Sequence, residues 1–297
     1  MTDYQILDPR FNSKIIGHAK LEQLWTGGRW LEGPAYFAAG KYLVFSDIPN
    51  NRLMRFDETN GSVSVFRNPS NNTNGNSTDL QGRLLSCEHL ERRITRTEYN
   101  GIVTVLADKF NGNRFNSPND IVAHSDGSIW FSDPTYGIDS DYEGERAASE
   151  IGASNVYRLS TDGIVQAMIT DRTQPNGLAF SPDEKTLYVS DTGASHKRDH
   201  PKAIHVYSVT PEGMEPQGIF CELQSGMYDG FRVDTSGCIW TSAGTAVHCY
   251  AQDGTLIGAI PVGETVSNVC FGGPKRNRLY ITAQTSLYAI YLSCNGA

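Results

Sequence analysis

One hexapeptide pattern returns six times along the chain, and it constrains the fold more than any other feature. The copies at residues 42–47, 83–88, 128–133, 186–191, 238–243 and 278–283 read YLVFSD, RLLSCE, SIWFSD, TLYVSD, CIWTSA and RLYITA. Each has an apolar core that is often aromatic or β-branched, which is typical of a buried β-strand. The sequence therefore predicts six copies of one all-β unit.

The spacing of the copies indicates a β-propeller. Their aligned Leu and Ile positions lie 40 to 58 residues apart. Six repeats of this length suit a six-bladed propeller with about four strands per blade. The composition has no break that would mark a linker, so we expect a single domain over residues 1–297. An alternating run at 19–27 is expected to close the last blade, and residues 138–154 are expected to form a surface insertion.

Charge and composition exclude several functions. Lys and Arg number 25 against 33 Asp and Glu, and the net charge of −8 argues against a nucleic-acid partner. The first twenty residues lack the apolar stretch of a signal peptide, and no apolar run approaches the roughly 18 residues of a membrane span. We therefore expect a cytoplasmic protein without a membrane partner, either a monomer or a homodimer.

The cysteines do not suggest a metal or disulfide framework. They lack the C-x-x-C spacing of zinc sites and are few for the length of the chain. We expect buried or near-surface thiols at all six positions, which are Cys87, Cys221, Cys238, Cys249, Cys270 and Cys294.

An oxygen donor precedes every copy of the hexapeptide by a similar distance. Ten or eleven residues before the aligned Leu or Ile stand Glu32, Asn74, Asn119, Asn176, Asp229 and Asn268. Asn and Asp favour turns before strands, which would explain any one of these residues. This explanation is poor for all six, because a turn could as easily carry Gly or Ser. Inner strands of a propeller converge on its axis, so we expect the six side chains to face one another near one mouth of the channel.

Such a ring predicts a site for a divalent cation. Carboxylate and carboxamide oxygens without His or Cys favour Ca²⁺, with Mg²⁺ or Mn²⁺ next and Zn²⁺ as a further alternative. Only Glu32 and Asp229 carry charge among the six donors. Their two negative charges would balance one divalent cation.

Longer motifs surround the donor positions. WLEGPAYF (30–37), NSPNDIV (116–122), QPNGLAFSPD (174–183) and DGFRVD (229–234) are the most informative of them. Together they resemble the gluconolactonase branch of the senescence-marker-protein (regucalcin) and gluconolactonase family, over roughly residues 20–290. The resemblance implies a six-bladed propeller with a divalent metal at its axis and an enzyme that hydrolyses sugar lactones.

The resemblance also implies roles for single residues. Glu32, Asn176 and Asp229 resemble the three protein ligands of the family's metal, and Asn119 resembles the residue that ligates the metal or contacts substrate. Arg114 lies near the position of a substrate-binding Arg in the animal branch, but it does not align with it cleanly. Relatives differ on a second calcium ion, which Asp133 would help to bind.

A mechanism follows from these positions. The metal would polarise the lactone carbonyl, and Asp229 would act as the base that activates water. In the alternative, Asp229 is only a ligand, and water or hydroxide on calcium attacks without a base. Asn74 and Asn268 suit sugar hydroxyls or a supporting role. Glu88 and His89 should lie near one mouth of the channel, where His89 would contact substrate, shuttle protons or serve the structure alone.

Two other functions stay open at this point. An organophosphate or aryl-ester hydrolase needs the same polarised oxo group and carboxylate. A non-catalytic propeller with structural calcium would bind a ligand without turnover. Covalent catalysis is the weaker prospect, because the chain has no G-x-S-x-G motif.

Overall fold

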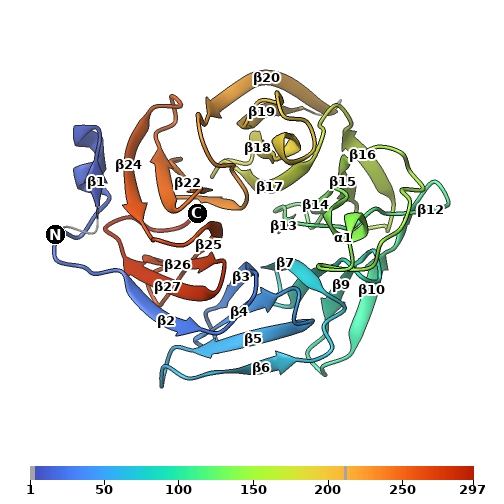
Figure 1. Ribbon diagram of the computed structural model, residues 1–297, viewed down its shortest axis with the longest axis horizontal. Coiled ribbons are helices and arrows are strands. Elements are labelled where there is room, and N and C mark those ends of the chain that lie inside the picture. The colour runs from blue at the N-terminus through green and yellow to red at the C-terminus, as the bar shows by residue number, and fades with distance from the viewer. Residues whose placement is uncertain (1–3, 211–212) are drawn as a thin grey trace.

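Six antiparallel sheets surround a central channel in the computed structural model, which describes residues 4–210 and 213–297 (Figure 1). The six-bladed β-propeller predicted from the repeats is therefore confirmed. The innermost strands of neighbouring sheets contact one another around the channel. Every copy of the hexapeptide forms the second strand of its sheet, counted outward from the channel.

The first three blades follow chain order from the channel outward. They consist of β3 (Leu31–Phe37), β4 (Tyr42–Asp47), β5 (Arg52–Asp57) and β6 (Val63–Arg67); β7 (Thr73–Thr78), β8 (Leu84–Glu88), β9 (Arg93–Thr97) and β10 (Val103–Ala107); and β13 (Ile121–Ala123), β14 (Ile129–Asp133), β15 (Asn155–Leu159) and β16 (Val165–Ile169). A small hairpin precedes the third blade and consists of β11 (Lys109–Phe110) and β12 (Asn113–Arg114).

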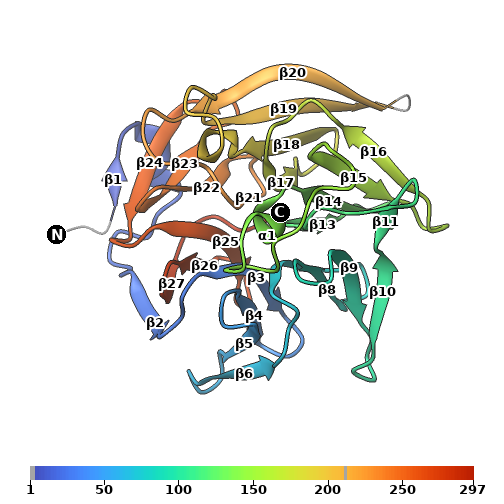
Figure 2. The ribbon, with the colours of Figure 1, turned by 45° about the vertical axis from the view of Figure 1, so that its right-hand side comes forward.

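The other three blades continue around the channel, and two of them also include a strand from the N-terminal part of the sequence. They consist of β17 (Pro175–Phe180), β18 (Thr186–Asp191), β19 (Ala203–Thr210) and β20 (Gly213–Glu222); β21 (Phe231–Val233), β22 (Ile239–Ala243), β23 (Ala246–Tyr250) and β24 (Leu256–Pro261), with β1 (Gln5–Ile6) at the edge; and β25 (Val266–Gly272), β26 (Arg278–Ala283), β27 (Ser286–Tyr291) and β2 (Glu22–Thr26). In Figure 2 the long β20 forms the outer rim of its blade. The helical turns are η1 (Pro9–Ser13), α1 (Tyr136–Asp139) and η2 (Gly193–Ser195).

The sixth blade takes its outer strand from the other end of the chain. β2 pairs with β27, with Glu22 opposite Ala289 and Thr26 opposite Ser286. The last sheet therefore contains residues from both ends of the sequence, and this pairing joins the ring of blades. No helix in residues 4–210 and 213–297 is long and apolar enough to cross a membrane.

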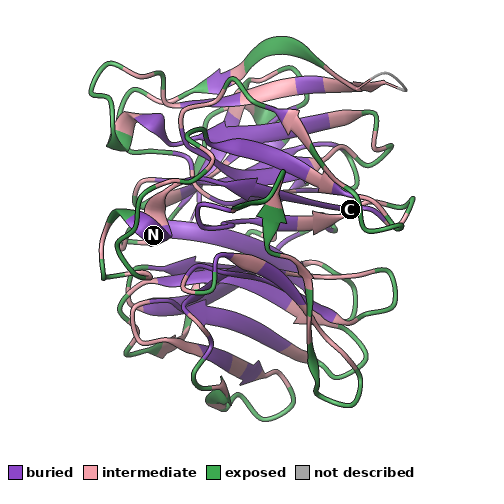
Figure 3. Cartoon of the chain, turned by 90° about the vertical axis from the view of Figure 1, so that its right-hand side faces the viewer, coloured by how far each residue is buried: buried purple, intermediate pink, exposed green. Residues whose placement is uncertain are grey.

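The apolar core lies between neighbouring blades, where the faces of two sheets meet. Trp240 of the fifth blade packs edge-on against Phe271 of the sixth, with ring centroids 6.2 Å apart. Phe131 and Tyr157 form a similar cluster between the second and third blades with Leu85. Figure 3 shows the buried residues concentrated in the strands and the exposed ones in the connecting loops. All six cysteines are buried and unpaired, as expected.

The carboxylate that ends several hexapeptides holds the backbone before the inner strand. Asp191 accepts hydrogen bonds from the backbone N–H groups of Thr173, Gln174 and Gly193, at 2.9 to 3.0 Å. Asp133 likewise accepts two backbone hydrogen bonds, from the N–H groups of residues 116 and 117. The repeated Asp therefore fixes the loop that leads into the channel.

Neighbouring inner strands approach so closely that a glycine is required at their contacts. A Cβ added to Gly177 would lie 2.3 Å from the backbone oxygen of Asp229 in the next blade, far inside van der Waals distance. Gly33 repeats this contact with the backbone oxygen of Asn74 at 2.1 Å. In both cases the glycine directly follows one of the six donors. Two consecutive residues therefore supply the oxygen donor and the close contact between strands.

We expect Gly177→Ala to lower the free energy of unfolding by about 1–3 kcal/mol, because the added methyl group meets backbone that must shift. Denaturant unfolding followed by circular dichroism measures the effect. Gly17→Ala is the control, since nothing lies within 4 Å of its added Cβ, and it should change stability by less than about 0.5 kcal/mol. Equal effects of the two substitutions would contradict the close-approach argument.

We expect Asp191→Asn to lower the free energy of unfolding by about 1–3 kcal/mol at neutral pH. Burial alone would raise the pKa of Asp191, but its three backbone donors outweigh burial and hold the pKa below the ordinary 3.8. The stabilisation is therefore fully present above 3.8 and is lost as pH falls through the lower folded-state value.

Urea unfolding of the native protein and Asp191→Asn across the acid range measures this dependence. The difference in the free energy of unfolding between the native protein and Asp191→Asn should stay constant from neutral pH to about pH 5. It should narrow below 3.8. A gap that already closes between pH 7 and about pH 5 would contradict the assignment.

Candidate active site

Five of the six predicted donors line one cavity of about 300 Å³, at the mouth of the channel where the inner strands begin. Three of them lie in the first two residues of β3, β7 and β17, and the other two stand two residues before β13 and β21. The register of β3, β7 and β17 with the second strand shifts at these residues. Such bulges redirect side chains. The five residues are Glu32, Asn74, Asn119, Asn176 and Asp229.

The sixth donor, Asn268, supports the cavity without lining it. Its Nδ2 donates to Glu32 Oε2 at 3.0 Å, and its Oδ1 accepts from the backbone N–H of Val269 at 2.8 Å. The same Glu32 oxygen also accepts from the N–H of Gly33 at 2.6 Å. These contacts fix one oxygen of Glu32 against the wall.

The cavity concentrates negative charge. Burial and neighbouring carboxylates raise the pKa of both Glu32 and Asp229, in spite of the amide hydrogen bonds that each accepts. Asp120 contributes to this repulsion from beside the cavity, where it lies 3.4 Å from Arg232. No Lys, Arg or His belongs to the described lining of the cavity. A bound cation would relieve this repulsion.

The cavity contains a third carboxylate that the sequence patterns did not identify. Glu143 belongs to the segment 138–154, which was expected to be only a surface insertion, yet its side chain lines the cavity. Burial, with the negative charge of Asp139, raises its pKa to about 7. The unusual length of this repeat was the one available signal. Tyr136 of α1 was missed too; its hydroxyl bonds to Thr192 and Ser195 at the cavity wall.

His89 connects the ring of donors to this segment. Its ring is fully buried, and burial lowers its pKa to about 4, so it is neutral at pH 7. The backbone oxygen of Glu143, 3.2 Å from Nδ1, can only accept, so Nδ1 carries the hydrogen. Nε2 then accepts from Asn74 Nδ2 at 3.3 Å. This leaves Asn74 Oδ1 buried without a partner among the described residues, as an acceptor on the cavity wall.

Two of the predicted substrate contacts lie elsewhere. Glu88 accepts hydrogen bonds from Arg93 and Thr95 at 2.8 and 3.1 Å and does not line the cavity. Arg114 lies in the hairpin before the third blade, where it donates to the backbone oxygen of Glu91. In this geometry each side chain contacts neighbouring residues and not the cavity.

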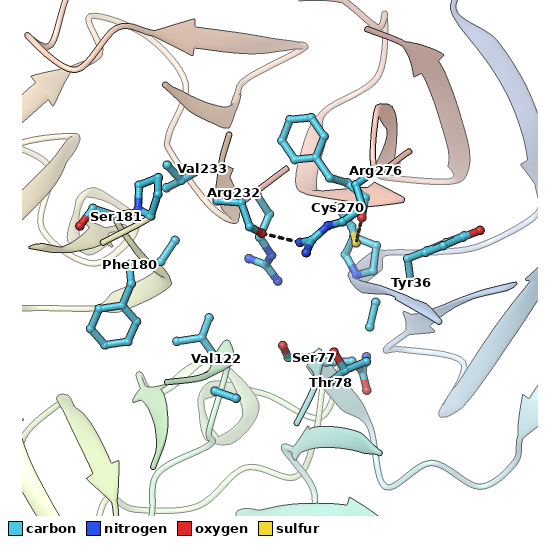
Figure 4. A pocket seen from close by; sticks show the side chains of 18 of the residues that line it. Tyr36, Ser77, Thr78, Val122, Phe180, Ser181, Arg232, Val233, Cys270 and Arg276 are labelled. Carbon is cyan, nitrogen blue, oxygen red and sulfur yellow. Dashed lines mark hydrogen bonds between the residues drawn. The ribbon is translucent and has the colours of Figure 1, made fainter. Parts of the chain in front are cut away.

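A second cavity, of about 330 Å³, occupies the opposite mouth of the channel (Figure 4). The later residues of the inner strands line it, and none of the six donors does. Figure 4 shows Arg232 extending toward its middle, and this side chain also donates to the backbone oxygen of Phe231 at 2.7 Å. The two mouths therefore differ in charge, and only the first carries the oxygen ring.

Comparison with known proteins assigns the family. A family model described as SMP-30/Gluconolactonase/LRE-like region matches residues 30–285. The chain belongs to this family. The resemblance inferred from the motifs is thereby confirmed, and with it the expectation of an enzyme of the lactone-hydrolase class.

Individual relatives agree with this assignment. A gluconolactonase from Zymomonas mobilis subsp. mobilis is 30% identical over 307 residues, which cover 95% of this chain and 84% of the relative. A solved gluconolactonase from Xanthomonas campestris is 38% identical, with a TM-score of 0.91, over 97% of this chain and 94% of that one. Regucalcin from Agrobacterium tumefaciens, described as calcium-binding, is 21% identical with a TM-score of 0.75 over 94% and 96%, and shows the fold alone.

Proposed function

We propose that this member of the SMP-30/gluconolactonase family hydrolyses a sugar lactone, an aldono-1,5-lactone, to the aldonic acid in the oxygen-lined cavity. The observation that carries the proposal is the ring of buried and half-buried oxygen donors around a cavity of about 300 Å³. That volume lies in the range of small-molecule sites. Family membership and the named gluconolactonase relatives support the choice of reaction.

The donor set fits a divalent cation. Glu32 and Asp229 supply negative charge, and Asn119 and Asn176 supply neutral oxygens beside them. Residues 4–210 and 213–297 contain no group of three or more His, Cys, Asp or Glu arranged to hold a metal, so this mixed set is the candidate. Hard oxygen ligands favour Ca²⁺, followed by Mg²⁺ or Mn²⁺, with Zn²⁺ as a further alternative. The cation would polarise the lactone carbonyl and stabilise charge developing on its oxygen.

We infer that Asp229 is the general base. It takes a proton from a water molecule whose oxygen bonds to the lactone carbonyl carbon. The ring C–O bond then breaks, and the proton passes from Asp229 to the departing ring oxygen, which leaves a carboxylic acid and a hydroxyl group. The position of Asp229 is fixed on both sides, because its backbone N–H donates to Ser242 and its backbone oxygen accepts from Ser190.

Other lining residues would hold the sugar. Asn74 offers its unpartnered Oδ1 to a substrate hydroxyl, and Tyr136 and Asn119 present further polar groups. Trp30 and Met227 supply apolar surface for the ring carbons. Asn268 acts through Glu32, whose orientation it fixes. A single cytoplasmic domain, working as a monomer or a homodimer, completes the proposal.

The test is hydrolysis of D-glucono-1,5-lactone, followed by acid release in weak buffer with the uncatalysed rate subtracted. We expect turnover that is lost on removal of metal and restored by Ca²⁺, Mg²⁺, Mn²⁺ or Zn²⁺. Asp229→Asn should lower kcat about 10²- to 10⁴-fold if the residue is the base. Asp199→Asn, at an exposed loop carboxylate, is the matched control and should leave the rate unchanged.

Calorimetric titration with Ca²⁺ separates the two roles of Asp229. If Asp229→Asn still binds calcium but no longer turns over the lactone, Asp229 is a base. If the variant loses calcium binding as well as turnover, Asp229 is a ligand alone. No rate above background for this lactone and a panel of other aldonolactones, with any of the four metals, would overturn the proposed function. Aryl-ester and organophosphate substrates would then be assayed. Calcium binding without turnover of any lactone, aryl ester or organophosphate would indicate a non-catalytic binding propeller.

A further inference from the structure

The segment that carries Glu143 is held firmly over the cavity. Backbone hydrogen bonds tie it to α1, from Glu145 N–H to the oxygen of Gly137 at 3.1 Å and from Ala147 N–H to the oxygen of Ile138 at 3.0 Å. His89 adds the bond to the backbone oxygen of Glu143 itself. The carboxylate of Glu143 is thus presented to the cavity from a fixed backbone.

Glu143 changes the charge balance of the cavity. Glu32, Asp229 and Glu143 bring three carboxylates to the described lining, which includes no basic side chain. When all three carboxylates are ionised, which for Glu143 requires a pH above its raised pKa, a divalent cation would offset two of these charges and leave one. The charge of Glu143 also acts on Glu32 and Asp229, whose pKa values it raises. A ligand in this space therefore meets a net negative wall.

We propose that Glu143 makes the cavity selective for uncharged polyhydroxylated lactones over lactones that carry a phosphate, sulfonate or second carboxylate group. This inference rests on the proposed lactone hydrolysis. Glu143 accepts hydrogen bonds from neutral sugar hydroxyls. An anionic substituent, confined with it in about 300 Å³, has no cationic side chain to pair with and is repelled.

The size of the effect follows from Coulomb's law. Two like charges a few ångströms apart near a protein surface interact strongly enough to change binding roughly ten- to one-hundred-fold. Added salt screens such an interaction, so the selectivity should weaken as ionic strength rises. A role of Glu143 in loop structure alone would not produce that salt dependence.

The experiment compares kcat/KM for D-glucono-1,5-lactone and its 6-phosphate in the metal-loaded native protein, Glu143→Gln and Glu145→Gln. Glu145 is an exposed carboxylate two positions away in the same segment and is outside the lining. We expect the native preference for the neutral lactone to fall roughly ten- to one-hundred-fold in Glu143→Gln, mainly because the phosphorylated lactone improves. Glu145→Gln should keep the native preference.

The outcomes separate this inference from the proposed function. If the native protein hydrolyses the neutral lactone but treats the 6-phosphate equally, or if Glu143→Gln keeps the native preference, the inference is wrong while the lactonase stands. If neither lactone is hydrolysed, the proposed function fails and the inference fails with it. Repeating the native assay at low and high NaCl checks the mechanism, because a preference that is independent of salt would also contradict a charge effect.

Discussion

Inner strands meet so closely that a backbone carbonyl of one strand occupies the space that a Cβ of the neighbouring strand would take. Gly33 and Gly177 permit this contact, and each immediately follows a donor of the oxygen ring. Because the glycine brings one strand against the next, the donor before it is brought toward the channel. The dimensions of the cavity therefore depend on two backbone atoms meeting at a position where no side chain fits.

Hydrogen bonds from the cavity wall explain how the cavity can hold so much negative charge. Buried carboxylates with no cation nearby destabilise a fold, and the raised pKa values of Glu32 and Asp229 reflect that cost. Asn268, the serine hydroxyls of the second strands and the backbone N–H groups hold the carboxylates and their strands in place. A site built in this way resembles other functional sites, where stability is given up for a charged arrangement that binds.

The spacing of the repeats predicted the site residues that the strands position, but it did not predict the residue that a loop brings to the cavity. The hexapeptides located the second strand of each blade, and counting back placed Glu32 and Asp229 at the channel mouth, because a repeated strand length sets both. Glu143 was not predicted because its segment is not part of the repeat. Tertiary hydrogen bonds bring this segment to the cavity. Glu88 was chosen because it ends a hexapeptide, and Arg114 because it lies near the position of a substrate-binding Arg of the family. Their side chains are held by local partners such as Arg93 and the backbone of Glu91.

The pairing of β2 with β27 has a consequence for the order in which the protein is built. The four strands nearest the channel in each of the first five blades come from a continuous stretch of chain, so local pairing can begin as soon as that stretch has left the ribosome. The sixth sheet joins Glu22 to Ala289, a contact of very high sequence separation, and such contacts form late. Val266 of that sheet lines the cavity. The lining of the cavity is therefore complete only after the sixth blade has been synthesised, although the first five blades already supply five of the six donors.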